Sequence, residues 1–209
     1  MRKIADSTVR RLSLYLRYLE EFETEGQATV SSEALATRGG TTSAQVRKDL
    51  SFFGSFGKRG LGYPVAELST RLRDILGLSR RYRLVVVGAG KIGSALAQYR
   101  GFRQRGFDIV ALFDTDQAKI GKTYDGVKVR STGELEAVLT AEQPDIGVIV
   151  VPGDQAQGVA DRLVQGGVRA ILNFAPAPLQ VPEDVSLKNV NLALELEALS
   201  FALANRIDD

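Results

Sequence analysis

Apolar side chains in the first part of the chain recur three or four positions apart, which is the spacing of amphipathic helices. The pattern predicts one helix over residues 7–25 and a shorter helix from Ser31 or Ser32 to Arg38. A third helix is expected to begin after Thr42, which follows a two-glycine turn. These elements predict a small helical domain at the N-terminus.

The third helix has an apolar face and a polar face. Val46, Leu50 and Phe53 recur at i, i+4 and i+7 and are expected to face inward. Thr42 and Gln45 have the spacing of a capping box, in which the Gln45 side chain reaches back to the N-cap amide. A short turn followed by such a helix is typical of a helix-turn-helix, whose second helix enters the major groove of DNA. Gln and Arg side chains in that position form paired hydrogen bonds with base edges.

Two cations, Lys58 and Arg59, lie in a glycine-rich stretch, residues 54–63, between segments that could form short strands. This stretch predicts a basic wing that contacts DNA phosphate or the minor groove. The side chains that we expect to contact DNA come from the first helix, the third helix and the wing, and are Arg10, Arg11, Ser43, Gln45, Arg47, Lys48, Ser51, Lys58 and Arg59. The alternative is that they are ordinary solvated charges on a helical scaffold.

An apolar strand followed by a glycine-rich turn opens the second part of the chain. Residues 84–87 are all apolar and lead into Gly88-Ala89-Gly90-Lys91-Ile92-Gly93 and a helical stretch, which is the order of a dinucleotide-binding loop. Asp114 follows the next strand, 21 residues after Gly93, where a carboxylate accepts hydrogen bonds from an adenosine ribose. The carboxylate favours NAD over NADP, although the nearby Lys119 leaves NADP open. The alternative for the loop is an empty Rossmann-type turn.

Strands and helices continue to alternate up to residue 190. The expected segments are helix 132–141, strand 146–151, helix 154–165, strand 169–172 and a last strand near 185–190. They predict an α/β protein in which a doubly wound Rossmann-type parallel sheet follows an N-terminal winged-helix domain. Because ligands lie beyond the carboxyl ends of such strands, the loops at 151–152 and 173–176 are expected on the nicotinamide side, although Phe174 could equally be a core aromatic. The expected cofactor residues are Gly88, Ala89, Gly90, Lys91, Ile92, Gly93, Asp114, Lys119, Val151, Pro152, Asn173, Phe174, Ala175 and Pro176.

The C-terminal segment has a wide apolar surface at helical spacing, which includes Leu192, Leu196, Leu199 and Leu203. Such a surface either packs on the protein's own sheet or forms part of a two-fold dimer interface. The chain is therefore expected to have three parts. They are a DNA-binding domain over residues 1–80, a NAD(H)-binding domain over residues 81–191 and a dimerisation helix over residues 192–209.

The composition narrows the chemistry that the chain can perform. Its 209 residues include no His, no Cys and no Trp. This excludes Ser-His-Asp and Cys-His nucleophile sets, zinc sites built from His or Cys, iron–sulfur clusters and disulfides, so we expect neither a catalytic residue nor a metal site. The net charge of +2 divides into +4 for residues 1–80 and −2 for residues 81–209. No apolar run approaches a membrane span and the N-terminus lacks the apolar core of a signal peptide, so a cytoplasmic protein with no membrane partner is expected.

The chain resembles the Rex family of bacterial redox-sensing transcriptional repressors along essentially its whole length. The residues that carry the resemblance are 11–19, 45–54, 56–60, 87–93, 173–176 and 199–201. The resemblance implies a homodimer that represses genes for NADH reoxidation, binds palindromic operator DNA when NADH is low and leaves it when NADH binds. It also implies that the C-terminal helix is exchanged between subunits, and that NAD(H) is a regulatory ligand and not the redox cofactor of an enzyme.

In some members of this family a basic residue, a Tyr, an Arg and an Asp tie the nicotinamide to the DNA-binding domain. The equivalents here are Lys91, Tyr99, Arg17 and Asn191, so the resemblance adds Tyr99 to the expected cofactor residues. Asn191 departs from the pattern because it carries no negative charge. Its alternative role is the N-cap of the last helix.

Two other classes of protein stay open from the residues alone. An NAD-dependent dehydrogenase with an N-terminal regulatory domain is disfavoured, because such enzymes commonly use a His acid–base and little chain is left for a substrate domain. A nucleotide-binding interaction module would use its basic N-terminus on a protein instead of DNA. Steady turnover of NADH would favour the first class, and binding that is insensitive to salt would favour the second.

Overall fold

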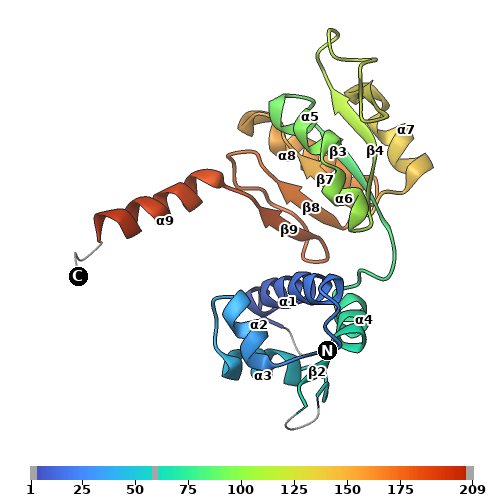
Figure 1. Ribbon diagram of the computed structural model, residues 1–209. Coiled ribbons are helices and arrows are strands. Elements are labelled where there is room, and N and C mark those ends of the chain that lie inside the picture. Colours follow the sequence, from blue (N-terminus) through green and yellow to red (C-terminus); the bar gives the residue numbers. More distant parts are fainter. Residues whose placement is uncertain (1–3, 58–60, 206–209) are drawn as a thin grey trace. The chain divides into compact units, whose positions relative to one another are not determined.

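The computed structural model describes residues 4–57 and 61–205 of the chain (Figure 1). The chain divides into two compact units, Met1–Arg80 and Arg81–Asp209. Across the described ranges, no helix is both long enough and apolar enough to cross a membrane.

In its described residues, the first unit consists of four helices and a two-stranded antiparallel ladder. Its elements are α1 (Asp6–Thr24), β1 (Thr29–Val30), α2 (Ser32–Arg38), α3 (Ser43–Ser51), β2 (Tyr63–Pro64) and α4 (Val65–Ile75). The apolar stripe of α1, which includes Leu12 and Leu16, is buried in one core with Leu68 and Leu72 of α4. The three helices that the apolar spacing predicts are therefore confirmed, with bounds shifted by about one residue.

The wing region differs from the predicted hairpin. β2 pairs antiparallel with β1, which places Tyr63 opposite Val30, and residues 54–57 form no strand. This pairing buries Val30 in the helical core, whereas a glycine-rich segment offers few side chains that could pack on a partner strand. Lys58 and Arg59, the expected tip of the wing, lie outside the described residues.

The second unit is built on a seven-stranded sheet in the order β5-β6-β4-β3-β7-β8-β9. Its strands are β3 (Tyr82–Val87), β4 (Phe107–Asp114), β5 (Thr123–Tyr124), β6 (Val127–Ser131), β7 (Ile146–Ile149), β8 (Ala170–Asn173) and β9 (Ser186–Asn189). Neighbouring strands are parallel except for β5 with β6. The chain order runs outward from β3 in both directions, so the sheet is doubly wound as predicted, with its switch point between β3 and β7.

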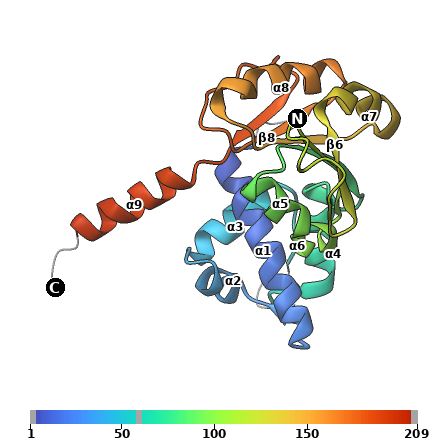
Figure 2. The same ribbon diagram turned by 90° about the horizontal axis from the view of Figure 1, so that it is seen from above.

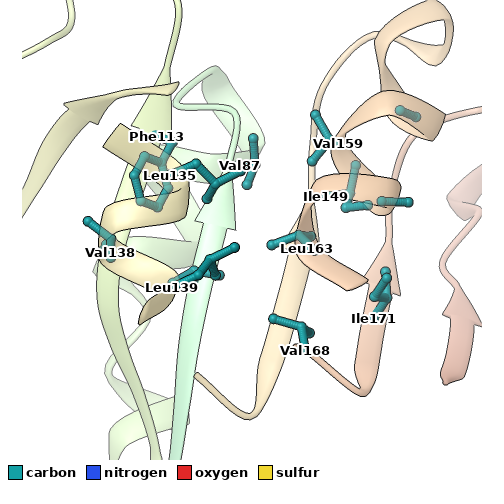
Figure 3. Packing of buried hydrophobic residues seen from close by; sticks show 14 of the residues in the cluster. Val87, Phe113, Leu135, Val138, Leu139, Ile149, Val159, Leu163, Val168 and Ile171 are labelled. Carbon is teal, nitrogen blue, oxygen red and sulfur yellow. The ribbon is translucent and has the colours of Figure 1, made fainter. Parts of the chain in front are cut away.

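Helices cover both faces of this sheet. They are α5 (Lys91–Gln98), α6 (Arg100–Gln104), the 3-10 helix η1 (Thr132–Glu134), α7 (Leu135–Glu142) and α8 (Gly153–Gln165). On one face, Leu139 of α7 and Leu163 of α8 belong to the same buried cluster as Val85 and Val87 of β3 (Figure 3). Val86 belongs to the cluster on the opposite face. β3 is thus buried on both faces, which explains its continuous apolar sequence.

Most of the expected strands and helices of the second unit are confirmed, and a few elements differ. The helix expected over residues 132–141 is a 3-10 turn followed by α7, and the strand expected over residues 146–151 ends at Ile149. α6, β5 and β6 have no counterpart in the sequence-based expectations. β5 and β6 lie at the sheet edge, where Val127 and Val129 alone are buried, and so short a pattern does not distinguish a strand from a loop.

The last helix, α9 (Leu192–Ala204), extends away from the sheet in both views (Figures 1 and 2). Asn191 is its N-cap and accepts a hydrogen bond from the amide of Ala193 at 3.0 Å. None of the residues in α9 is buried, and its large apolar side chains are 58–70% exposed. The possibility that this helix packs on the protein's own sheet is therefore wrong.

Candidate nucleic-acid interface and dinucleotide site

The direction of α3 is set by its first turn and by its apolar face. Thr42 Oγ1 accepts a hydrogen bond from the amide of Gln45 at 3.1 Å, so Thr42 is the N-cap as predicted. Val46 and Leu50 are buried beneath the helix. The expected reach of the Gln45 side chain back to the N-cap is wrong, because its amide donates to Asp49 at 2.8 Å instead.

The opposite side of α3 presents polar side chains. Arg47, Lys48 and Ser51 are exposed, and Ser43 and Gln45 are half-buried. Arg47 Nη1 donates to the Ser32 hydroxyl of α2 at 2.9 Å. A hollow of about 620 Å³ lies beside α3 and is lined by Arg47, by residues 54–57 and by Tyr63. Hydrogen-bonding groups and a concave surface therefore occur together on this side of the unit.

A carboxylate that no sequence motif indicates lies behind this surface. Asp49 is 0% exposed. Arg11 donates to both of its oxygens, from Nε at 2.6 Å and from Nη2 at 2.8 Å. Tyr15 Oη donates to Oδ2 at 3.0 Å, and Gln45 Nε2 donates to Oδ1 at 2.8 Å. The sequence signal for Asp49 is its place three residues after Val46, on the inward face of α3, where a charge is rare.

The two neighbouring arginines of α1 have different surroundings. Arg10 is exposed, as a residue that contacts DNA would be. The guanidinium of Arg11 binds Asp49 at two points and also donates to Thr8 Oγ1 at 3.2 Å. Since Arg11 uses its donors inside the unit, its geometry fits an internal partner better than the expected contact with DNA.

The charges in this cluster are fixed by the hydrogen bonds. Burial raises the pKa of the Asp49 carboxyl, but the bonds from Arg11, Gln45 and Tyr15 outweigh burial, so the pKa lies below its ordinary value. Burial and the bond to Asp49 both raise the pKa of Tyr15. At neutral pH Asp49 is therefore a carboxylate and Tyr15 a hydroxyl donor.

The glycine loop joins β3 to α5 through close backbone contacts. The amide of Gly88 donates to the carbonyl of Phe113 at 2.8 Å. A Cβ at position 93 would lie 1.8 Å from the carbonyl oxygen of Gly88, so only glycine fits there. Gly90, the N-cap of α5, faces open space, since a Cβ there would meet nothing within 4 Å. The first amides of α5 lack partners within the helix, which makes this open space suitable for an anion such as a pyrophosphate.

Asp114 stands at the end of β4 and is tied to this loop. Its Oδ2 accepts from the amide of Ala89 at 2.8 Å and from Lys119 Nζ at 3.1 Å, and its Oδ1 accepts from the amide of Asp116 at 2.8 Å. Burial raises the pKa of the Asp114 carboxyl, but the two amides and the Lys119 ammonium outweigh burial and leave the pKa below its ordinary value. Asp114 is therefore an ionised acceptor at the edge of the loop.

A pocket of about 620 Å³ brings the glycine loop and the expected ribose acceptor together with the 151–152 loop, one of the two loops that the sequence predicts on the nicotinamide side. Gly90, Asp114, Lys119, Val151 and Pro152 all line it. These residues come from the ends of three different strands, which is the usual place for a ligand in a doubly wound sheet.

Arg162 of α8 also lines this pocket, although no motif indicates it. Its Nε donates to Glu136 Oε1 at 2.6 Å, and its Nη2 donates to the carbonyl of Thr132 at 2.6 Å. The bond from Arg162 lowers the pKa of Glu136 to about 2. Arg162 is therefore held as a fixed cation in the pocket wall.

A second pocket, of about 530 Å³, lies between the 174–176 loop and the beginning of α9. The expected residues in its wall are Ile92, Phe174, Ala175 and Pro176, and the wall continues through residues 189–194. The nicotinamide-side loop and the base of α9 thus share one pocket.

The other expected cofactor residues are not among the lining residues of these two pockets. Asn173 is buried and donates to the carbonyl of Ala177 at 3.1 Å and to Asn189 Oδ1 at 2.9 Å, so it ties the 174–176 loop to β9. Gly88, Ala89 and Gly93 form the turn itself. Lys91 and Tyr99 are exposed. The Tyr99 ring packs edge-on against the Phe102 ring, with 5.0 Å between the ring centroids.

The two units define a class of protein in which a winged-helix domain precedes a Rossmann-type domain of the dinucleotide-binding kind. Two family models match the chain, a putative DNA-binding protein N-terminus over residues 3–51 and a CoA binding domain over residues 79–177.

The chain is similar over nearly its full length to proteins of known role. It is 52% identical to the redox-sensing transcriptional repressor Rex of Syntrophomonas wolfei, with 97% of this chain and 96% of that protein covered. Identity to the same repressor of Carboxydothermus hydrogenoformans is also 52%, over 95% and 96% of the two chains. The chain belongs to the Rex family of redox-sensing transcriptional repressors, which confirms the resemblance and the predicted fold class.

Solved structures of one relative match the fold closely. The crystal structure of RSP in complex with β-NAD+ and operator DNA gives a TM-score of 0.92 at 39% identity, covering 97% of this chain and 94% of that chain. The structure of RSP in complex with β-NADH gives 0.88 at 38% identity, covering 97% and 95%.

Proposed function

We propose that this chain is a homodimeric repressor that binds palindromic operator DNA through its winged-helix domain and is released when NADH binds to its Rossmann-type domain. Residues 1–80 bind DNA, residues 81–191 bind NAD(H), and the segment 192–209, which contains α9, serves for dimerisation. The observation that carries the proposal is that both sites occur in one chain that aligns over 97% of its length with RSP, whose structures include operator DNA with β-NAD+ and, separately, β-NADH.

The DNA-binding side depends on the exposed face of α3. Gln45 and Arg47 lie in the first two turns, where residues of a recognition helix contact base edges. The further contacts, to phosphate, sugar or base, are assigned to Ser43, Lys48, Ser51, Arg10, Lys58 and Arg59. Such phosphate contacts release counterions, so the logarithm of the binding constant should fall steeply with the logarithm of salt concentration.

The residues of the glycine loop fit NAD(H). The open space at Gly90 and the first amides of α5 would hold the pyrophosphate, and Asp114 would accept hydrogen bonds from the adenosine ribose. The Asp114 carboxylate disfavours a 2′-phosphate, so NAD(H) is preferred to NADP(H). When bound, NAD(H) supplies the redox signal, because its nicotinamide ring is positive in the oxidised form and neutral in the reduced form.

Release by NADH requires that NADH bind two states of the protein with different affinity. The second pocket offers a physical basis, because its wall includes both the 174–176 loop and the first residues of α9. Asn173 ties the same loop to β9, the strand that leads into α9, through its hydrogen bonds to the Ala177 carbonyl and to Asn189 Oδ1. Occupancy of this pocket therefore acts directly on the base of the proposed dimerisation helix and favours one dimer geometry over another.

Binding of an operator duplex at fixed salt, with NADH, NAD and NADPH added in turn, tests this function. NADH is expected to weaken DNA binding by about 5- to 150-fold, and by linkage the duplex must weaken NADH binding by the same factor. NADPH should have little effect. Equal affinities for NADH with and without the duplex would overturn the proposal.

We also infer that NAD(H) is a ligand and that the protein is not an enzyme, and that it acts in the cytoplasm where DNA and NADH meet. Incubation with NADH and a panel of small carbonyl compounds is expected to give no steady oxidation of NADH. Steady turnover would restore the dehydrogenase interpretation.

The homodimer depends on α9. Its large apolar side chains are exposed in the described part of the chain, and an apolar surface of this extent is typical of a protein interface. The sheet also carries an apolar groove of about 290 Å³, lined among others by Val86, Val148 and Leu172, on which the α9 of a second copy could pack. A two-fold dimer would also match two palindromic half-sites one helical turn apart.

Light scattering of an α9 variant tests the dimer. Replacing Leu196 and Phe201 together by Glu places charges in the proposed interface, and we expect a monomer that no longer binds an operator duplex. Glu197→Gln, an exposed polar change on the same helix, is the control and should stay dimeric. A dimeric Leu196→Glu/Phe201→Glu variant would contradict the assignment of α9.

A further inference from the structure

The Asp49 cluster joins two helices of the first unit through one carboxylate. Arg11 and Tyr15 belong to α1, whereas Gln45 and Asp49 belong to α3. The side chain of Asp49 is 1% exposed and that of Arg11 is 28% exposed. The cluster therefore extends from the core of the unit to the side of α3 on which Gln45 lies.

An ion pair in this position is a weak means of holding two helices together. Removal of the two charges from water offsets most of their attraction, and apolar side chains of similar volume often stabilise a fold as well or better. A carboxylate with four hydrogen bonds does, however, fix the direction of each donor that it binds. The function of Asp49 thus depends on which donor needs a fixed direction.

Gln45 is the donor that borders the proposed DNA surface. A carboxylate can only accept hydrogen bonds, so Gln45 must turn its NH2 group toward Asp49, and Nε2 lies 2.8 Å from Oδ1. The amide oxygen, Oε1, is then the acceptor directed away from Asp49. Gln45 is half-buried and is the third residue of α3, in the part of a recognition helix that contacts base edges.

We propose that Asp49 is a positioning residue for base recognition, which holds Gln45 so that Oε1 is presented to the major groove as a fixed hydrogen-bond acceptor. The donors on base edges in that groove are the exocyclic amino groups, N6 of adenine and N4 of cytosine. Oε1 of Gln45 therefore favours a base with an amino group over the carbonyl of guanine or thymine at the position that it faces. This inference rests on the proposed binding of operator DNA.

Selection of duplexes from a randomised library by the full-length protein tests the inference. The wild-type protein is expected to enrich adenine or cytosine at one position of each half-site, and Gln45→Met should lose the preference there. Asp49→Asn removes the charge with little change of shape, and it should lose the preference at the same position by a factor of about 5 to 150 while other positions keep theirs. Asp74→Asn, an exposed carboxylate on α4, is the matched control and should keep every preference.

An exchange of the two polar groups gives a sharper test. Gln45→Glu places two carboxylates face to face and should lose the preference for an amino group. In the double variant Gln45→Glu/Asp49→Asn, the new amide at position 49 can donate to the new carboxylate at position 45, whose second oxygen again faces outward. We expect the double variant to recover the preference. If Asp49→Asn alone fails to fold by circular dichroism, the double variant carries the test, because one carboxylate remains among the same donors.

The possible results separate the inference from the function on which it rests. Three results would overturn the positioning role of Asp49. Asp49→Asn could retain the preference for an amino group, or it could lose affinity equally for all sequences. The double variant could also show no more preference than Gln45→Glu. Unchanged preferences in Gln45→Met would overturn the reading of a base by Gln45. A wild-type protein that enriches no sequence would instead overturn the proposed binding of operator DNA.

Discussion

Asp49 in the first unit and Asp114 in the second are both buried carboxylates, 0% and 9% exposed, and both have a pKa below the ordinary value. Their hydrogen bonds come from different sources. The four bonds to Asp49 come from side chains, three of them from Arg11 and Tyr15 on another helix. Asp114 accepts from the backbone amides of Ala89 and Asp116, and from the side chain of Lys119.

A buried carboxylate that is held by side chains should tolerate substitution of its partners less well than one that is held by backbone amides. The bonds to Asp49 require particular side chains 34 and 38 residues away, so a change at any one of them leaves a buried group without its partner. The bonds to Asp114 are made largely by the backbone of a loop whose path is set by its glycines, so they persist when neighbouring side chains change. We therefore expect the first site to be sensitive to substitution of its partners and the second to be sensitive to the path of its loop.

The largest effect is expected from removal of Asp49 itself. Asp49→Ala leaves the charge of Arg11 without its counter-ion and the hydroxyl of Tyr15 without its acceptor, and the free energy of unfolding should fall by about 3–5 kcal/mol in urea denaturation. Asp114→Ala frees amides beside an open pocket, where water can bind them, and should cost about 1–3 kcal/mol. Asp74→Ala, at an exposed position, should stay within about 0.5 kcal/mol. Equal losses of unfolding free energy in Asp49→Ala and Asp114→Ala would contradict the expected difference between the two sites.

The next effect concerns the loop that holds Asp114. Gly90→Val places its side chain where a Cβ meets nothing within 4 Å, so the fold should tolerate it while the affinity for NADH falls by more than about 100-fold, or about 2.7 kcal/mol. Isothermal titration calorimetry measures the affinity. Gly93→Ala is the contrast, because its Cβ would lie 1.8 Å from a carbonyl oxygen and should lower stability as well. A Gly90→Val protein that still leaves DNA when NADH is added would contradict the role of this space.

Acid is expected to reduce the stability that Asp49 and Asp114 contribute to the fold, and to do so over the same pH range. Folding lowers the pKa of both carboxyls, so their contribution to stability is complete above the ordinary value of 3.8 and is lost as the pH falls through the lower folded values. Urea unfolding between neutral pH and about pH 3 should show this loss. The loss should be smaller in Asp49→Asn, which has no carboxyl to protonate at that site. Identical curves for the two proteins would show that Asp49 does not titrate on unfolding.

The smallest effect is expected from Lys119→Met. The Lys119 side chain is 33% exposed, so its pair with Asp114 should contribute less than about 1 kcal/mol to the free energy of unfolding. The removal of a cation from this pocket should also weaken NADPH binding more than NADH binding. If Lys119→Met lowered the free energy of unfolding as much as Asp49→Ala, Asp114 would also depend on a side-chain partner. The two buried carboxylates would then not differ in the source of their stabilisation.

The contrast between bonds from a local loop and bonds from distant side chains also explains what could be predicted from the sequence. Asp114 could be expected because a strand, a glycine loop and a fixed spacing are local features that backbone geometry imposes. Asp49 and Arg162 could not, since each acquires its role from partners that only the folded chain brings near. The pairing of β1 with β2 was equally inaccessible, because strands of two residues carry no periodic signal. The apolar surface of α9 was evident in the sequence, but only the exposure of its side chains decides between the two expected partners.

In the proposed homodimer, the exposure of α9 makes the stability of the protein depend on its concentration in the cell. A newly synthesised chain exposes the apolar side chains of α9 until a second copy covers them, so in the proposed homodimer the thermal stability must rise with protein concentration. A chain that has not yet met a partner is also at risk of aggregation. The number of copies that a cell makes, as well as its supply of NADH, would then set how much of the repressor can occupy an operator.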